Sequence, residues 1–353
     1  MLSGTTALAR PTRTHSLRST ARTAPHMADV RALSDTVQDW SAQDAALLAL
    51  GQELKACGYR FTTVTPLTHR RVIARDPERA AATLEDVFGW SRPFGRTSLP
   101  DRIVALLGDA GELQTAGGLV RSNVRFSTLE GQLFVHSAFP TDQHDAVFFG
   151  PDTYRFARVI KHALKETTMV PPSRVVDIGC GSGAGGLLAA SLLPTRGREI
   201  ILTDINPRAL RYSRVNATLN KIAGVTTIES DLFAHVEGGA DLIVSNPPYL
   251  VDPQQRAYRH GGGKLGTELS LRIVEQSLAR LMPHGRLVLY TGTPVVAGTD
   301  TFRAALSEAL ADRGLSFTYE EIDPDVFGEE LDDGPYREAD RIAAVALVLH
   351  APR

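Results

Sequence analysis

The amino-acid sequence predicts an α/β protein built on a doubly wound, mostly parallel sheet. From about residue 150 onward, short apolar runs of strand length alternate with stretches of helical pattern. Such alternation is typical of βαβ units, whose strands are buried on both faces. The expected strands are residues 174–178, 199–203, 225–228, 241–245 and 286–290, and the helices between them include 184–193, 207–219 and 269–281.

Two more apolar runs, 316–322 and 341–349, close the chain without a helical pattern between them. Parallel neighbours need a crossover connection, whereas antiparallel strands do not. We therefore expect these two strands to pair as an antiparallel hairpin.

The first 140 residues follow a different plan. A helix is expected over 41–58, with Ser41 as its N-cap and Gly58 as its end. Shorter helices are expected over 79–88 and 100–107. Two strands, 119–126 and 132–139, form a hairpin that turns near Glu130-Gly131. The pattern predicts a smaller N-terminal α+β domain over residues 27–140, and a winged helix is one arrangement that fits it. A second domain is expected over 141–353.

Residues 1–26 stand apart, because they contain four arginines and no acidic residue and show no apolar periodicity. This composition is typical of disorder. We favour Met27 as the true start of the protein, and an organellar transit segment is the alternative.

Composition excludes several classes of protein. The chain has 353 residues, 38 Lys and Arg against 40 Asp and Glu, and a net charge of -2. This balance argues against a dedicated nucleic-acid coat protein. Two cysteines are too few for a disulfide scaffold or a cysteine-built metal site. No apolar run is long enough to span a bilayer. We expect a soluble cytoplasmic protein, with no membrane partner and no metal site.

A glycine-rich turn follows the first strand of the second domain, and it contains Gly179, Gly181 and Gly183 just after Asp177. Glycines let a ligand approach the backbone closely, and the helix that follows offers free N–H groups. Asp204 ends the second strand, where a carboxylate can accept both hydroxyls of a ribose. The same glycines also fit G-x-G-x-x-G, so a nicotinamide dinucleotide stays open as an alternative.

Two acidic positions favour a nucleoside that carries a cationic amino-acid end over a nicotinamide dinucleotide. Asp177 lies where it would meet a cationic amino-acid end of a ligand, and it would repel a pyrophosphate. After the third strand, Asp231 and Leu232 place a carboxylate and an apolar flank where an adenine edge could dock.

The fourth strand runs directly into Asn246, Pro247, Pro248 and Tyr249. Two prolines cannot continue a strand ladder, so they fix a rigid turn at the carboxyl edge of the sheet, where open α/β sheets bind ligands. The Asn246 side-chain oxygen and the Pro247 carbonyl would accept the two hydrogens of a planar –NH2 group. Tyr249 would stack on its plane.

Residues 150–350 resemble class I S-adenosylmethionine-dependent methyltransferases of the amino-directed branch. The Asn246–Tyr249 turn and the glycine-rich stretch 261–266 are most similar to those of protein glutamine N5-methyltransferases that act on release factors. The resemblance implies a seven-stranded sheet of order 3-2-1-4-5-7-6 with an antiparallel last strand. Residues 149–153, which include Thr153, partly match a loop that closes over the cofactor in that family.

The resemblance also implies residue roles. Asp177, Gly179, Gly181 and Gly183 would hold the methionine end of S-adenosyl-L-methionine, Asp204 its ribose, and Asp231 with Leu232 its adenine. The turn residues Asn246, Pro247, Pro248 and Tyr249 would hold the acceptor nitrogen.

The methyl acceptor has more than one candidate. A protein glutamine, in a release factor or ribosomal protein, is the first choice, and the acidic residues of 323–340 favour it because they repel phosphates. The alternative is adenine N6 or guanine N2 of RNA, with the Arg-rich span 60–102 binding phosphates. Remote alternatives are a nicotinamide-dependent oxidoreductase and a cofactor-binding module without catalysis. The loop around 256–264 is either a mobile lid or a solvated loop.

Overall fold

The structure, a computed structural model, describes residues 40–165, 172–194, 197–311, 313–332 and 334–351. The predicted tail, residues 1–26, lies outside these described residues. Trp40–Arg353 forms one compact unit. Among the described residues, no helix combines the length and the apolar character that a membrane crossing requires.

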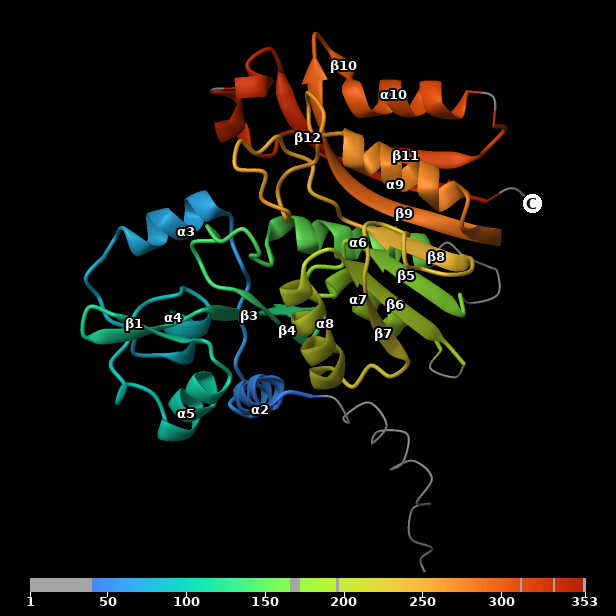
Figure 1. Ribbon diagram of the computed structural model, residues 1–353. Coiled ribbons are helices and arrows are strands. Elements are labelled where there is room, and N and C mark those ends of the chain that lie inside the picture. The colour runs from blue at the N-terminus through green and yellow to red at the C-terminus, as the bar shows by residue number, and fades with distance from the viewer. Residues whose placement is uncertain (1–39, 166–171, 195–196, 312, 333, 352–353) are drawn as a thin grey trace, which may run out of the picture. The chain divides into compact units, whose positions relative to one another are not determined.

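The predicted sheet is the centre of this unit (Figure 1), with the strand order β7-β6-β5-β8-β9-β12-β11. Leaving out the short β10, this is the order 3-2-1-4-5-7-6 counted along the chain. Strand β12 is antiparallel to both of its neighbours, and β5 to β9 are parallel. The fold class and the C-terminal hairpin are therefore confirmed. The bounds are β5 Arg174–Ile178, β6 Glu199–Asp204, β7 Val225–Glu229, β8 Ala240–Ser245, β9 Leu281–Val296, β10 Thr299–Asp300, β11 Phe317–Asp323 and β12 Arg341–His350.

Apolar side chains cover both faces of the sheet, because successive strand residues point to opposite faces. Val175 packs in one cluster with Phe156 of α6 and Leu187 of α7. Val176 packs in the other with Ile273 of α9 and Phe302 of α10. The helices are α6 Pro151–Lys165, α7 Ala184–Leu192, α8 Pro207–Leu219, α9 Glu268–Leu278 and α10 Thr301–Leu310, with 3-10 turns η1 Gly328–Leu331 and η2 Gly334–Tyr336.

The N-terminal region combines helices with two separate β-hairpins, β1-β2 and β3-β4. Helix α2 begins after Ser41, whose side chain accepts from the Asp44 N–H as expected for an N-cap. The bounds are α2 Ala42–Ala56, α3 Pro66–Ile73, α4 Leu84–Phe88, α5 Asp101–Asp109, β1 Leu113–Ala116, β2 Leu119–Ser122, β3 Val124–Leu129 and β4 Gln132–Ser137.

Three local predictions were wrong. The helix expected over 79–88 covers only α4, because Thr83 and Asp86 form a capping box that starts the helix at Leu84. The strand expected over 119–126 is divided, because Asn123 leaves the ladder and its N–H donates to Glu112 O. Segment 149–153, expected as a loop, contains the start of α6 at Pro151.

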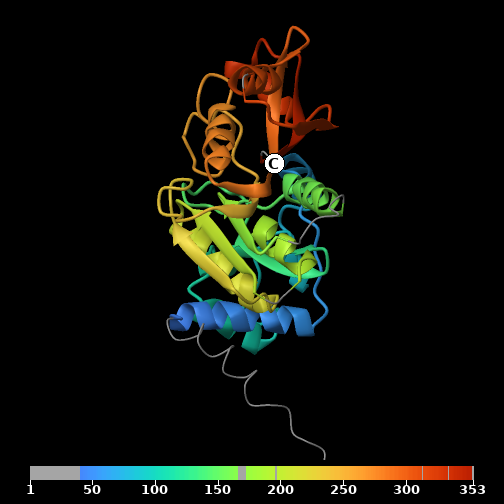
Figure 2. The same ribbon diagram turned by 90° about the vertical axis from the view of Figure 1, so that its right-hand side faces the viewer.

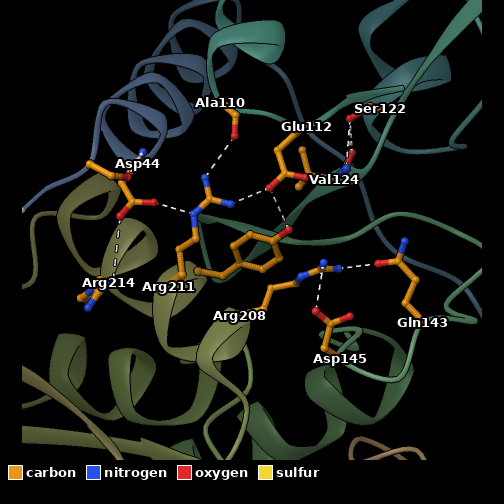
Figure 3. A network of polar contacts seen from close by, with 12 residues as sticks. Asp44, Ala110, Glu112, Ser122, Val124, Gln143, Asp145, Arg208, Arg211 and Arg214 are labelled. Atoms are coloured by element: carbon orange, nitrogen blue, oxygen red, sulfur yellow. Dashed lines mark hydrogen bonds and ion pairs between the residues drawn. The ribbon is translucent and has the colours of Figure 1, made fainter. Parts of the chain in front are cut away.

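Helix α8 joins the N-terminal region to the sheet. Tyr212 and Leu219 of α8 are buried in the same apolar cluster as Leu47 and Leu50 of α2, and α2 lies across α8 (Figures 1 and 2). Beside this cluster, Arg211 of α8 binds carboxylates from two N-terminal elements (Figure 3). The division of the chain into domains at residue 140 remains a prediction, and an extensive packed interface connects the two sides of it.

Candidate active site

The parallel strands β5, β6, β7 and β8 end at one edge of the sheet, and a cavity opens there. We call it the glycine-loop cavity, since Gly179 and Gly181 form part of its wall. Seven of the eight residues predicted to hold a nucleoside cofactor line it, namely Thr153, Asp177, Gly179, Gly181, Asp204, Asp231 and Leu232. The edge that the sequence predicted therefore brings these residues together.

Gly183, the eighth of these residues, lies in a closely packed position, and its contact with the cofactor remains a prediction. It is the N-cap of α7 with a φ of +78°, and a Cβ there would lie 3.0 Å from Ser213 Cβ and 3.2 Å from side-chain atoms of Leu187 and Leu202. A larger residue would therefore push α7 away from the sheet and from α8.

Asp177 is buried in the wall of the glycine-loop cavity. Its side chain is 2% exposed, and its Oδ2 accepts from the Gly186 N–H at 2.7 Å. Burial raises the pKa of this carboxyl to about 7, and the nearby Asp204 adds to the effect. No cation among the described residues forms an ion pair with Asp177. A cationic ligand group would therefore favour its ionised form.

Asp204 is held in place by backbone donors. Its two oxygens accept from the N–H groups of Gly181 and Asn206, each at 2.9 Å. Burial raises its pKa. Asp231 is exposed and lies 3.3 Å from Arg272, while Leu232 next to it is buried. These two residues give the cavity a polar and an apolar flank.

A second cavity lies beside the first, and we call it the Tyr249 cavity. Pro247 and Tyr249 line only this one, whereas Asn246 and Pro248 line both. The Asn-Pro-Pro-Tyr turn thus forms part of the boundary between the two cavities. Other residues that line both are Phe148 and Tyr258.

Tyr249 is fixed by contacts on several sides. Its hydroxyl donates to Asp152 Oδ2 at 2.6 Å, and its ring lies edge-on to Phe327 with centroids 5.9 Å apart. A Cβ at Gly292 of β9 would lie 2.2 Å from the Tyr249 ring, so glycine is required there. Burial and the neighbouring Asp152 raise the pKa of Tyr249 well above its ordinary value, so the hydroxyl keeps its proton.

Asp152 is a site residue that the sequence did not single out. It lies in the first turn of α6 and lines the Tyr249 cavity. Besides Tyr249, its carboxylate binds the Tyr290 hydroxyl at 2.9 Å and Arg155 Nη1 at 2.9 Å. Its two tyrosine partners lie on β9 and after β8, far from it in the sequence, so no local pattern could identify this site.

The loop after the turn folds back onto it. The Gly261 N–H donates to Leu250 O at 2.7 Å, and a Cβ at Gly266 would lie 2.2 Å from Tyr249 O. Arg256 pairs with Asp252 at 2.6 Å, and Arg259 pairs with Glu330. The arginines of this loop are therefore bound to acids of the protein itself.

A family model described as the methyltransferase small domain matches residues 157–298. The chain contains a methyltransferase domain. This match agrees with the predicted methyltransferase class for residues 157–298, the class whose predicted cofactor is S-adenosyl-L-methionine. It gives no support to a nicotinamide-dependent oxidoreductase.

Curated relatives of this domain fall into two groups. The chain is 36% identical over 140 residues to a release factor glutamine methyltransferase of Deinococcus radiodurans, which covers 36% of the chain and 48% of the relative. It is 38% identical over 116 residues to ribosomal RNA small subunit methyltransferase C of Chromohalobacter salexigens, covering 33% and 30%. The matches span less than two thirds of these relatives.

Solved structures are less similar to this chain in sequence than the curated relatives are. The tRNA m1G37 methyltransferase of M. jannaschii is 16% identical with a TM-score of 0.44, covering 65% of this chain and 57% of that chain. The T. thermophilus 16S rRNA N2 G1207 methyltransferase is 16% identical with a TM-score of 0.42, covering 68% and 57%.

Proposed function

We propose that the protein transfers a methyl group from S-adenosylmethionine to a planar amide or amino nitrogen. The observation that carries this proposal is the position of the Asn246–Tyr249 turn. Asn246 and Pro248 line both cavities, so a group held at the turn is next to the ligand of the glycine-loop cavity.

The residues of the glycine-loop cavity fit the cofactor. Asp177 is a buried carboxylate that forms no ion pair with a cation among the described residues, which suits the cofactor's ammonium group. Asp204, fixed by two N–H donors, would bind the ribose, and Asp231 with Leu232 would bind the adenine. When bound, the cofactor supplies an electrophilic methyl group.

The turn would hold and orient the acceptor. The Asn246 side-chain oxygen and the Pro247 carbonyl accept the two hydrogens of a planar –NH2 group, while the fixed Tyr249 ring limits its orientation. Holding the nitrogen in this way directs its lone pair towards the methyl group. The two acceptors also stabilise the positive charge that develops on the N–H bonds. After transfer the nitrogen proton is strongly acidic, so no dedicated base is required.

Two acceptors satisfy this description. A protein glutamine, in a release factor or ribosomal protein, is the first choice from the sequence, and the release factor glutamine methyltransferases among the relatives support it. An RNA purine amino group is the second candidate. It is supported by the ribosomal RNA relatives and by exposed arginines of α3, which have no ionic partner among the described residues. A cytoplasmic location remains a prediction.

The test is methyl transfer from radiolabelled S-adenosylmethionine into a cell extract, followed by nuclease or protease digestion. Label that resists nuclease and is lost to protease would support protein glutamine, and the converse would support RNA. Asn246→Ala is the control for label that does not arise from this site. If the wild-type protein binds the cofactor but labels no more than this variant, the proposal is wrong.

A further inference from the structure

Helix α3 and the residue after its C-cap carry three exposed arginines, Arg70, Arg71 and Arg75, which we call the α3 surface. Residues 54–75 contain no Asp or Glu. None of the three arginines forms a hydrogen bond or an ion pair with another residue in the described part of the chain. Their charges are therefore available to a partner.

The orientation of α3 is fixed by His69, which is 1% exposed. The His69 ring lies 4.1 Å from the Phe139 ring and 5.3 Å from the Trp90 ring, and its Nε2 is 3.0 Å from Trp90 O. Since helix neighbours point in different directions around the axis, anchoring His69 leaves Arg70 and Arg71 directed outward.

The protein beneath α3 adds positive charge. Burial lowers the pKa of His69 to about 4, and the charged groups that add to this effect are Arg125 and Arg92. Arg125 is itself buried, and its Nε donates to a backbone carbonyl, Ser137 O, at 3.3 Å. It forms no ion pair with a carboxylate among the described residues. Two buried arginines therefore lie close to His69, on the buried side of α3.

The α3 surface begins at the proposed acceptor site. Pro66, the first residue of α3, lines the Tyr249 cavity, and Arg70 follows it by about one helical turn, or ~6 Å along the axis. Four aromatic side chains also line this cavity, namely Phe148, Tyr249, Tyr258 and Phe327. Flat aromatic walls suit a base, since unpaired bases are commonly bound by stacking on such side chains.

Exposed acidic residues flank another part of the wall of the Tyr249 cavity. Phe327 of its wall is flanked by Asp325 and Glu329, both exposed. Carboxylates repel phosphates, so a polyanion that reaches this cavity would be confined to the α3 side.

We propose that the α3 surface binds the phosphate backbone of a single-stranded RNA segment whose purine base enters the Tyr249 cavity. This inference rests on the proposed function for the identity of the reacting group, and it favours RNA over protein as the acceptor. An acidic protein segment would also bind arginines, but a glutamine amide is smaller than a purine base and would cover less of the four aromatic walls.

The test measures binding of a fluorescein-labelled single-stranded oligoribonucleotide of about twelve nucleotides by anisotropy, at several salt concentrations and without cofactor. The double variant Arg70→Glu/Arg71→Glu removes two phosphate contacts. We expect at least a ten-fold loss of affinity at low salt. The slope of log K against log salt should fall by ~1.4, at ~0.7 for each phosphate of a single strand.

The matched control is Lys165→Glu/Lys221→Glu, which changes the net charge equally. Both lysines are exposed. Lys165 ends α6 and Lys221 follows α8, so both precede the start of a strand, at the edge opposite the site. We expect this control to bind RNA within two-fold of the wild type. A single Arg75→Glu variant, with a smaller loss expected, provides an independent check.

Several results would overturn the inference. An equal loss in the control would mean that only net charge matters, and unchanged binding by the α3 variant would exclude the surface. The inference would also be wrong if the α3 variant labelled a protease-sensitive fraction less than the wild type while its RNA binding stayed intact. The partner of the α3 surface would then be a protein. Failure of the proposed function is distinguishable, because methyl transfer is tested with Asn246→Ala and RNA binding is tested with the α3 variants.

Discussion

Arg211 of α8 should be a main support of the contact between the N-terminal region and the sheet. Its Nε lies 2.5 Å from Asp44 Oδ1 of α2, and its Nη1 lies 2.8 Å from Glu112 Oε1 (Figure 3). A third bond reaches Ala110 O at 3.2 Å. The two carboxylate side chains are only 12% and 9% exposed.

Substitution Arg211→Ala would leave these two carboxylates without their main cation. Removing one partner of a buried ion pair costs about 3–5 kcal/mol. Arg211 is 22% exposed, and solvent screens part of its charge, so we expect a loss near the lower limit, about 3 kcal/mol. With an unfolding entropy of ~2.1 cal/mol/K per residue over residues 40–353, Tm should fall by ~4–5 °C.

The assay is urea unfolding followed by fluorescence and circular dichroism, with Tm measured separately. The matched control is Arg214→Ala on the same helix. Arg214 is 52% exposed and lies 3.9 Å from Asp44, so its loss should cost about 0–0.5 kcal/mol. If the two variants differ by less than about 1 kcal/mol, the Arg211 contacts do not stabilise this interface and the reasoning is refuted.

Four further predictions concern the proposed site. Asn246→Ala should reduce turnover at least 100-fold while calorimetry finds cofactor affinity nearly unchanged; loss of both would place Asn246 in the cofactor site. Asp204→Ala should mainly weaken cofactor binding, by at least ten-fold in the same titration. Burial raises the pKa of Asp177 to about 7, and a bound ammonium group favours its ionised form. Cofactor affinity should therefore rise by up to ten-fold per pH unit between pH 5.5 and 7. In Asp177→Asn the affinity should not change with pH over this range. Gly292→Ala should displace the Tyr249 ring and lower turnover without weakening cofactor binding, and unchanged kinetics would contradict this.

The ligand-free protein should show the opposite pH dependence at Asp177. Its pKa is raised above the unfolded value of 3.8, so the unfolded chain loses this proton first as the pH rises. The free energy of unfolding should therefore fall between about pH 4 and 7 from this group. Comparing the wild type with Asp177→Asn isolates the effect.

The parts of the fold that the sequence predicted well are those whose pattern is set by burial on both sides. Strand β5 and helix α8 have the predicted bounds, because their apolar patterns are strong and an Asn206 N-cap followed by Pro207 marks the start of α8. Helix α3 was missed for the opposite reason. Its only buried residue is His69, so the helix lacks the apolar stripe that identifies an amphipathic segment.

The candidate site was predictable only where its residues end a strand or a turn. Asp177, Asp204 and Asn246 each lie at the carboxyl end of a parallel strand, and parallel strands place such ends at one edge. Asp152 and Phe327 reach the same edge from a helix and from the loop of the last hairpin. Their proximity to Tyr249 depends on tertiary packing, which no local pattern records.

The C-terminal hairpin is for this reason part of the proposed acceptor site as well as part of the sheet. Because β12 is antiparallel to β9, the loop between β11 and β12 opens at the carboxyl edge of the parallel strands. There, Asp323 binds Arg155 at 2.8 Å, and Arg155 binds Asp152, which holds the Tyr249 hydroxyl. Phe327 packs on the Tyr249 ring from the same loop. Reversal of the last strand thus keeps the whole connection beside the Asn-Pro-Pro-Tyr turn, whereas a parallel last strand would require it to cross to the other edge.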